Sequence, residues 1–172
     1  MQHLSKWHGF NRNHWHRLTE IATYRTSTAS LQNSYLIALP EEYEIETRIK
    51  LIESNLKDVN YGIILRGATL EYSIELHMSG KVEVLEYDYN SGLVRKLISS
   101  NSNYSMDENA ISIKLAINRE RFILLVNNYI IGHSEFNVTS WQDLRLYTSK
   151  QSKIAVDFLT IRHMTLESIE NT

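Results

Sequence analysis

Two apolar runs separated by only two asparagines constrain most strongly how this 172-residue chain can fold. The runs are 122–126 (FILLV) and 129–131 (YII), and Asn127 and Asn128 stand between them. Asn adopts positive φ more readily than other residues with a side chain, so this spacing predicts a type I′ hairpin. Because 122–126 is apolar at every position, we expect a strand covered on both faces, as a central strand is, with the other strands added around the hairpin.

Alternation of apolar and polar residues runs through much of the remaining chain. In 43–51, Tyr, Ile, Thr, Ile and Leu alternate with Glu, Glu, Arg and Lys. Within 81–89 the pattern slips by one residue, which indicates a β-bulge. Further strands are expected at 61–66, 70–77, 81–89, 93–98, 111–117, 141–148 and 153–164. Strands at roughly 8–12-residue spacing, without a helical period, predict an all-β fold, an antiparallel two-sheet β-sandwich.

Length and composition limit the classes of protein to consider. We expect a single domain over 1–172, with 1–20 as an irregular N-terminal segment packed on it. The formal net charge of −2 argues against nucleic-acid binding, and no apolar run reaches the ~18–20 residues of a membrane span. Cysteine is absent, which removes disulfides and thiolate ligands. The first residues do not resemble a signal peptide, so we expect a cytoplasmic protein, or an extracellular one if the sequence is a module of a longer chain.

A series of short motifs follows in a fixed order along the chain: Trp15, then Tyr43, Ile45 and Ile49, YGIILR at 61–66, YSIEL at 72–76, a strand led by Gly80, Val126-Asn127-Asn128 and Val156-Asp157-Phe158. This order resembles the concanavalin A-like lectin/glucanase sandwich, the jelly roll shared with laminin G-like domains. The resemblance covers most of the chain and implies two curved antiparallel sheets packed face to face. This sandwich hosts lectins, hydrolases and interaction modules, so the resemblance alone does not give a function.

Acidic residues in the strands raise the question of catalysis. Glycosidases of this fold that resemble laminarinases carry a strand motif Glu-x-Asp-x-x-Glu, which points the acid and the nucleophile into one cleft. This sequence lacks the motif, and alternation with core residues predicts exposed strand faces for its acids, although Glu71 and Glu75 could line a concave groove. We therefore favour a non-catalytic binding module. The alternative is a glycoside hydrolase that uses two of the residues Glu71, Glu75, Glu86 and Asp88.

Sugar binding requires flat aromatic faces together with a few polar side chains, and the ten Tyr and three Trp residues supply the rings. We predict no catalytic residue, and a glycan or protein ligand bound through the concave sheet or the end loops. A third interpretation is a structural or assembly domain that uses an exposed sheet edge, for example in a homodimer. The predicted ligand-binding residues are Tyr72, Glu75, Tyr87, Tyr89, Asn90 and Trp141.

Metal-binding signals are weak in the sequence. His14 and His16 have a spacing that can chelate a metal, but no Cys and no paired carboxylate stands nearby, so we interpret them as surface residues. His77 and His133 are isolated and are interpreted as rim or turn residues. The nearest approach to a lectin calcium loop is Asp88-Tyr89-Asn90. A structural calcium ion is conceivable there without a clear motif, and we expect no cofactor and no metal.

Overall fold

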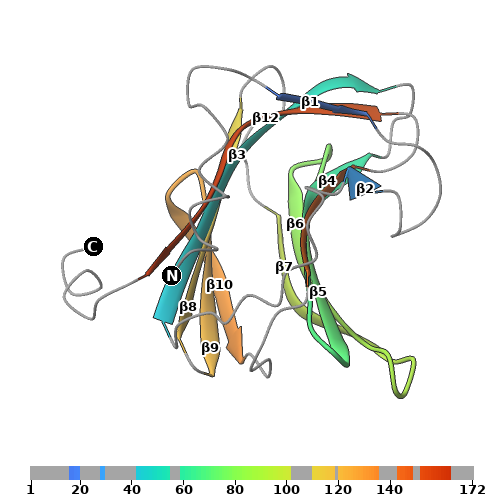
Figure 1. Ribbon diagram of the computed structural model, residues 1–172, viewed down its shortest axis with the longest axis vertical. Coiled ribbons are helices and arrows are strands. Elements are labelled where there is room, and N and C mark those ends of the chain that lie inside the picture. Colours follow the sequence, from blue (N-terminus) through green and yellow to red (C-terminus); the bar gives the residue numbers. More distant parts are fainter. Residues whose placement is uncertain are drawn as a thin grey trace.

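Two sheets of antiparallel strands face each other in the computed structural model of the protein (Figure 1). The backbone is described for residues 16–19, 28–29, 42–54, 59–101, 110–118, 120–135, 143–148 and 152–163. Sheet A contains, in spatial order, β1 (His16–Thr19), β12 (Ser152–His163), β3 (Glu42–Ser54), β8 (Ile111–Asn118), β9 (Arg121–Val126) and β10 (Tyr129–Glu135). Sheet B contains β2 (Thr28–Ala29), β11 (Asp143–Thr148), β4 (Asn60–Arg66), β5 (Leu70–His77), β6 (Lys81–Asp88) and β7 (Val94–Asn101).

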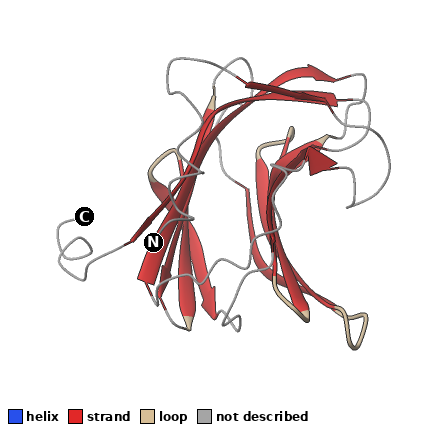
Figure 2. Cartoon of the chain, viewed as in Figure 1, coloured by secondary structure: helices blue, strands red, loops and turns tan. Residues whose placement is uncertain are grey.

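Strands are the only regular elements in the described ranges (Figure 2), and these ranges contain no helix that could cross a membrane. The predicted antiparallel β-sandwich is confirmed. Within the N-terminal segment that the sequence led us to expect as irregular, the described residues His16–Thr19 form strand β1 and pair with β12.

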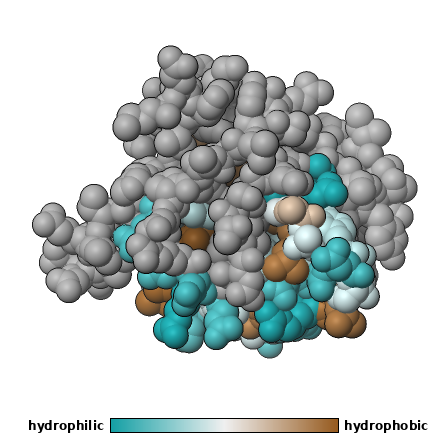
Figure 3. Space-filling model, turned by 60° about the horizontal axis from the view of Figure 1, so that its bottom comes forward, coloured by the Kyte–Doolittle hydropathy of each residue, from teal (hydrophilic) through white to brown (hydrophobic). Residues whose placement is uncertain are grey.

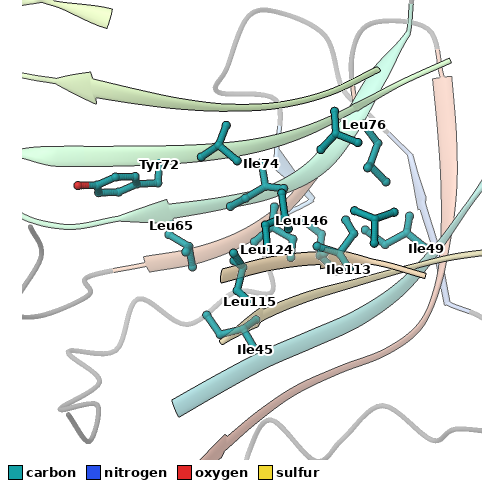
Figure 4. Close-up of a cluster of buried hydrophobic side chains, with 14 of the residues drawn as sticks. Ile45, Ile49, Leu65, Tyr72, Ile74, Leu76, Ile113, Leu115, Leu124 and Leu146 are labelled. Atoms are coloured by element: carbon teal, nitrogen blue, oxygen red, sulfur yellow. The ribbon is translucent and has the colours of Figure 1, made fainter. Parts of the chain in front are cut away.

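The core lies between the two sheets and is built from the apolar phase of each strand (Figure 4). Alternation places every second side chain on the same face, so the period-2 pattern becomes one buried surface per sheet. Burying one such side chain contributes about 1.5–3 kcal/mol. Sheet A supplies Ile45, Ile49, Ile113, Leu115 and Leu124, and sheet B supplies Leu65, Tyr72, Ile74, Leu76 and Leu146.

The Asn-Asn hairpin forms as predicted, with φ of 50° at Asn127 and 67° at Asn128. Asn127 also ties the turn to β8, because its backbone N–H donates to the Ser112 carbonyl while its Oδ1 accepts from the Ser112 N–H. The expectation that 122–126 is a central strand covered on both faces is wrong. Strand β9 lies next to the edge strand β10, and Ile123 on its outer face is 37% exposed. The apolar run 122–126 therefore forms a strand with one buried face and one partly exposed face.

The predicted β-bulge lies on a different strand. Strand β6 pairs with β5 without any shift, whereas its register with β7 passes from Val84↔Ile98 to Leu85↔Lys96, which leaves Leu97 as the extra residue. The slip in the sequence pattern instead reflects a polar residue, Glu86, on the core-facing phase of β6, opposite Tyr72.

Candidate functional site

The outer face of sheet B brings together most of the acidic and aromatic residues of interest. Strands β5 and β6 curve with their convex side towards β8, β9 and β10 of sheet A, which makes the outer face of sheet B concave (Figure 1). Since Tyr72, Ile74 and Leu76 of β5 point into the core, the alternate residues Glu71 and Glu75 occupy the outer face.

The two carboxylates on the outer face of β5 are buried. Glu71 and Glu75 are each only 8% exposed, so the expectation of a solvent-exposed strand face is wrong for them. Buried carboxylates need hydrogen-bonding or charged partners, and neighbouring strands supply these. The alternation in the sequence indicated the face on which each acid lies, but not how deeply that face is covered.

At one end of the outer face lies a group that we call the His77 cluster, defined as Glu75, His77 and Glu83. Glu83 of β6 stands directly opposite Glu75 of β5. His77 Nε2 lies 3.2 Å from Glu83 Oε2 and 3.7 Å from Glu75 Oε2. Glu75 also accepts hydrogen bonds from Ser73 Oγ (2.8 Å) and Asn60 Nδ2 (2.9 Å). Two carboxylates and one imidazole thus converge within one hairpin.

Two lysines hold the carboxylate of Glu83 in its charged form. Lys81 Nζ lies 2.7 Å and Lys96 Nζ 2.5 Å from the same oxygen, Oε1. Burial by itself raises the pKa of Glu83, but the hydrogen bonds and charges of the two lysines outweigh it and lower the pKa to about 2. At neutral pH this group is therefore an acceptor and not a proton donor.

At the other end of the outer face lies the Tyr89 cluster, defined as Arg66, Glu71, Tyr87 and Tyr89. The Tyr89 hydroxyl donates to Glu71 Oε2, and the rings of Tyr87 and Tyr89 meet edge to face with centroids 4.9 Å apart. The Arg66 guanidinium lies 4.9 Å from the centroid of the Tyr89 ring. Burial and the Glu71 carboxylate raise the pKa of Tyr89 to about 12. Tyr89 as a residue is nevertheless 38% exposed, so this side chain is both anchored and accessible.

A third acidic group belongs to the core side of the sheet. Tyr72 is 1% exposed, and its hydroxyl donates to Glu86 Oε2 at 2.6 Å. Arg95 Nη2 lies 3.0 Å from the other carboxylate oxygen. Tyr72 therefore stabilises a polar contact inside the sandwich, and its ring does not face the outer surface.

The Asp88-Tyr89-Asn90 segment uses its acidic side chain to form a turn. The two carboxylate oxygens of Asp88 accept from the Asn90 backbone N–H and from Ser91 Oγ, each at 2.8 Å. The hydrogen bonds from Ser91 and from Asn90 lower the pKa of Asp88. Asp88 thus serves as the acceptor of its own turn, and among the described residues the only converging metal-ligand group is the His77 cluster.

The structure unites half of the predicted ligand-binding residues on one surface. Glu75, Tyr87 and Tyr89 share the outer face of sheet B, whereas Asn90 is exposed in the β6–β7 turn. Trp141, like Trp15, His14 and His16, lies outside the residues whose side chains are described.

Sequence reasoning missed several residues of the outer face. His77 was interpreted as a rim or turn residue, and Glu83 was not among the predicted ligand-binding or catalytic residues. The signal for Glu83 was available, because a hairpin that turns at Ser79-Gly80 pairs Leu76 with Val82 and so sets Glu75 opposite Glu83. No sequence pattern indicated that two lysines would meet on one of its oxygens.

Comparison with known proteins identifies the fold. No family model and no curated protein sequence matches the chain. Among solved structures, the carbohydrate-binding module CBM66 from Bacillus subtilis is similar, with 12% identity and a TM-score of 0.57 over 72% of this chain and 76% of that one. Sheep galectin-11 gives 14% identity and a TM-score of 0.50 over 79% of this chain and 97% of that one. This chain has a concanavalin A-like jelly-roll fold.

The same jelly roll also occurs within larger proteins. A xylan β-1,4-xylosidase from Bacillus halodurans C-125 is similar over 87% of this chain, with 12% identity and a TM-score of 0.61, but this chain spans only 33% of that protein's length. At such identities the similarity concerns the fold alone, so the function has to be argued from the residues of the concave sheet.

Proposed function

We propose that this jelly-roll chain is a non-catalytic carbohydrate-binding module, and that the outer face of sheet B binds the glycan. The observation that carries the proposal is the Tyr89 cluster, in which an accessible aromatic ring is held in place by a buried carboxylate and an arginine. An aromatic ring packs against the apolar face of a pyranose, while carboxylate and guanidinium groups bind its hydroxyls.

Rigidity supports this assignment. Tyr89 is fixed at its hydroxyl by Glu71 and at its backbone N–H by the Thr69 carbonyl, at 2.9 Å. A side chain that is already held in its binding orientation loses little conformational freedom when a ligand arrives. The similar folds include a carbohydrate-binding module, CBM66, and a galectin, and this supports a glycan-binding surface on the sandwich.

A hydrolytic alternative finds one supporting observation. The ligand atoms of Glu75, His77 and Glu83 all lie within 4.8 Å of one another, and retaining glycosidases hold two carboxyl groups about 5–5.5 Å apart. Such a pair needs one proton donor, yet Glu83 stays ionised with a pKa of about 2. Glu75 would have to donate the proton, although its two oxygens accept hydrogen bonds from Ser73 and Asn60. This arrangement favours binding over hydrolysis.

The experiment is a glycan-array screen of the purified chain, with and without calcium, followed by calorimetry on any hit. We expect Tyr89→Ala and Tyr87→Ala to weaken binding about tenfold, since each removes an aromatic contact. The matched control is Tyr129→Ala, which removes a 75% exposed Tyr from sheet A and should leave the affinity unchanged. Trp141→Ala tests the remaining predicted aromatic residue. A hit whose affinity is the same in the Tyr89 and Tyr129 variants would refute the proposed surface.

Self-association is a second candidate function, and the edge strand β10 favours it. Tyr129 and Ile130 are large apolar side chains, 75% and 70% exposed, on the last strand of sheet A in the described part of the chain. Edge strands with exposed apolar residues are suited to pairing with another chain. On the face that Figure 3 shows, the coloured residues are mostly hydrophilic, with apolar residues between them. Light scattering should show a dimer that Ile130→Lys dissociates; a monomer at all concentrations would dismiss this candidate.

A further inference from the structure

Three potential metal-ligand atoms converge in the His77 cluster, all within 4.8 Å of one another. His77 Nε2 is buried and has no hydrogen-bond partner, and it lies 3.2 Å from Glu83 Oε2 and 3.7 Å from Glu75 Oε2. If Nε2 carried only its lone pair, it would repel both carboxylate oxygens. The arrangement therefore calls either for a proton on Nε2, which turns the nitrogen into a hydrogen-bond donor, or for a metal cation at this point.

The neighbouring lysines do not provide that cation. Lys81 and Lys96 both contact Oε1 of Glu83, which leaves Oε2 directed at His77. On the other carboxylate, Ser73 occupies Oε1 of Glu75. Donors that hold the far oxygens of two carboxylates orient the near oxygens, as outer-sphere partners do around metal ligands.

Asn60 is a competitor for the remaining oxygen. Its Nδ2 donates to Glu75 Oε2 at 2.9 Å, the same atom that faces His77. A carboxylate oxygen has a second lone pair, so the same oxygen can accept this hydrogen bond and also bind a metal ion. The three ligand atoms also sit on the adjacent strands β5 and β6, whose register fixes their spacing.

We propose that Glu75, His77 and Glu83 form a binding site for a divalent transition-metal ion on the outer face of sheet B. One imidazole nitrogen and two carboxylate oxygens suit Zn²⁺ and similar ions better than Ca²⁺, which prefers oxygen ligands only. Three protein ligands leave coordination positions for water. Lys81 and Lys96 offset the two carboxylate charges, so we expect weaker binding than at a site with uncompensated acids. The inference does not depend on glycan binding.

The test is a Zn²⁺ titration of the full chain by calorimetry, together with the visible absorption of bound Co²⁺. His77→Ala and Glu75→Gln should each remove one Zn²⁺ equivalent and its Co²⁺ absorption, whereas His133→Ala, an exposed histidine on β10, should leave both unchanged. Ser73→Ala should weaken this site about tenfold, because it frees the far oxygen of Glu75. Circular dichroism confirms that each variant is folded.

Two results would overturn the inference. One is a stoichiometry and affinity for Zn²⁺ that are identical in the wild type and in His77→Ala, since any binding would then come from other histidines. The other is an imidazole resonance of His77 that titrates with pH in the same way with and without millimolar Zn²⁺, since a proton would then be the only cation that the cluster takes.

Discussion

Replacing Glu83 by Gln removes the negative charge that two lysines share, and the structure gives the cost. The pKa of Glu83 lies at about 2 instead of the ordinary 4.5, a difference equivalent to about 3.4 kcal/mol. Solvent screens part of this, because the side chains of Lys81 and Lys96 are 35% and 51% exposed. We therefore expect Glu83→Gln to lower the free energy of unfolding at neutral pH by about 1–2 kcal/mol.

The pH dependence follows from the sign of the pKa change. A carboxyl with a depressed folded-state pKa stabilises the fold above its unfolded-state pKa, and this contribution is lost as the pH falls from 4.5 towards 2. Urea denaturation should thus show a difference in the free energy of unfolding between the wild type and Glu83→Gln at pH 7, and this difference should shrink by more than half near pH 3. Glu44→Gln is the control, since the Glu44 carboxylate lies 3.7 Å from Lys114 Nζ, farther than either lysine lies from Glu83, and the substitution should cost about 0–1 kcal/mol. An equal difference at both pH values would refute the reasoning.

Three further predictions concern the backbone and the Tyr89 cluster. Gly62→Ala should prevent stable folding or lower the free energy of unfolding by more than about 3 kcal/mol, because a Cβ there would lie 1.9 Å from the carbonyl oxygen of Ile74. A urea denaturation midpoint near that of the wild type would contradict this. Asn128→Val should cost about 1–2 kcal/mol at its positive φ while Asn128→Gly should cost nothing, and equal midpoints for the two would argue against the turn type. Ultraviolet titration should show a tyrosine with a pKa near 12. This transition should be missing in Tyr89→Phe, and its pKa should be lower in Glu71→Gln. An unchanged titration in Glu71→Gln would mean that burial alone raises the pKa.

The sequence was a good guide wherever the structure depends on neighbours along the chain. Alternation at 43–51 predicted β3 and its buried face, and the two asparagines predicted the hairpin between β9 and β10. The prediction that β9 is covered on both faces was wrong, because a strand with an apolar outer face next to a sheet edge has the same composition as a strand that is buried on both faces. It also placed Tyr72 among the ligand-binding residues, although the phase that it shares with Ile74 assigns it to the core.

What the sequence determined by itself is the fold class and the phase of the strands that alternate regularly, since backbone geometry fixes the direction of alternate side chains; β6, with Glu86 on its core-facing phase, is the exception. Only the tertiary structure decided which residues meet across strands. Pairing with β7 brought Lys96 to the Glu83 oxygen that Lys81 already held. These contacts depend on pairings between strands and on the depth of a curved face, neither of which a linear pattern records. The charge state of the His77 cluster and the anchoring of Tyr89 therefore became visible only in three dimensions.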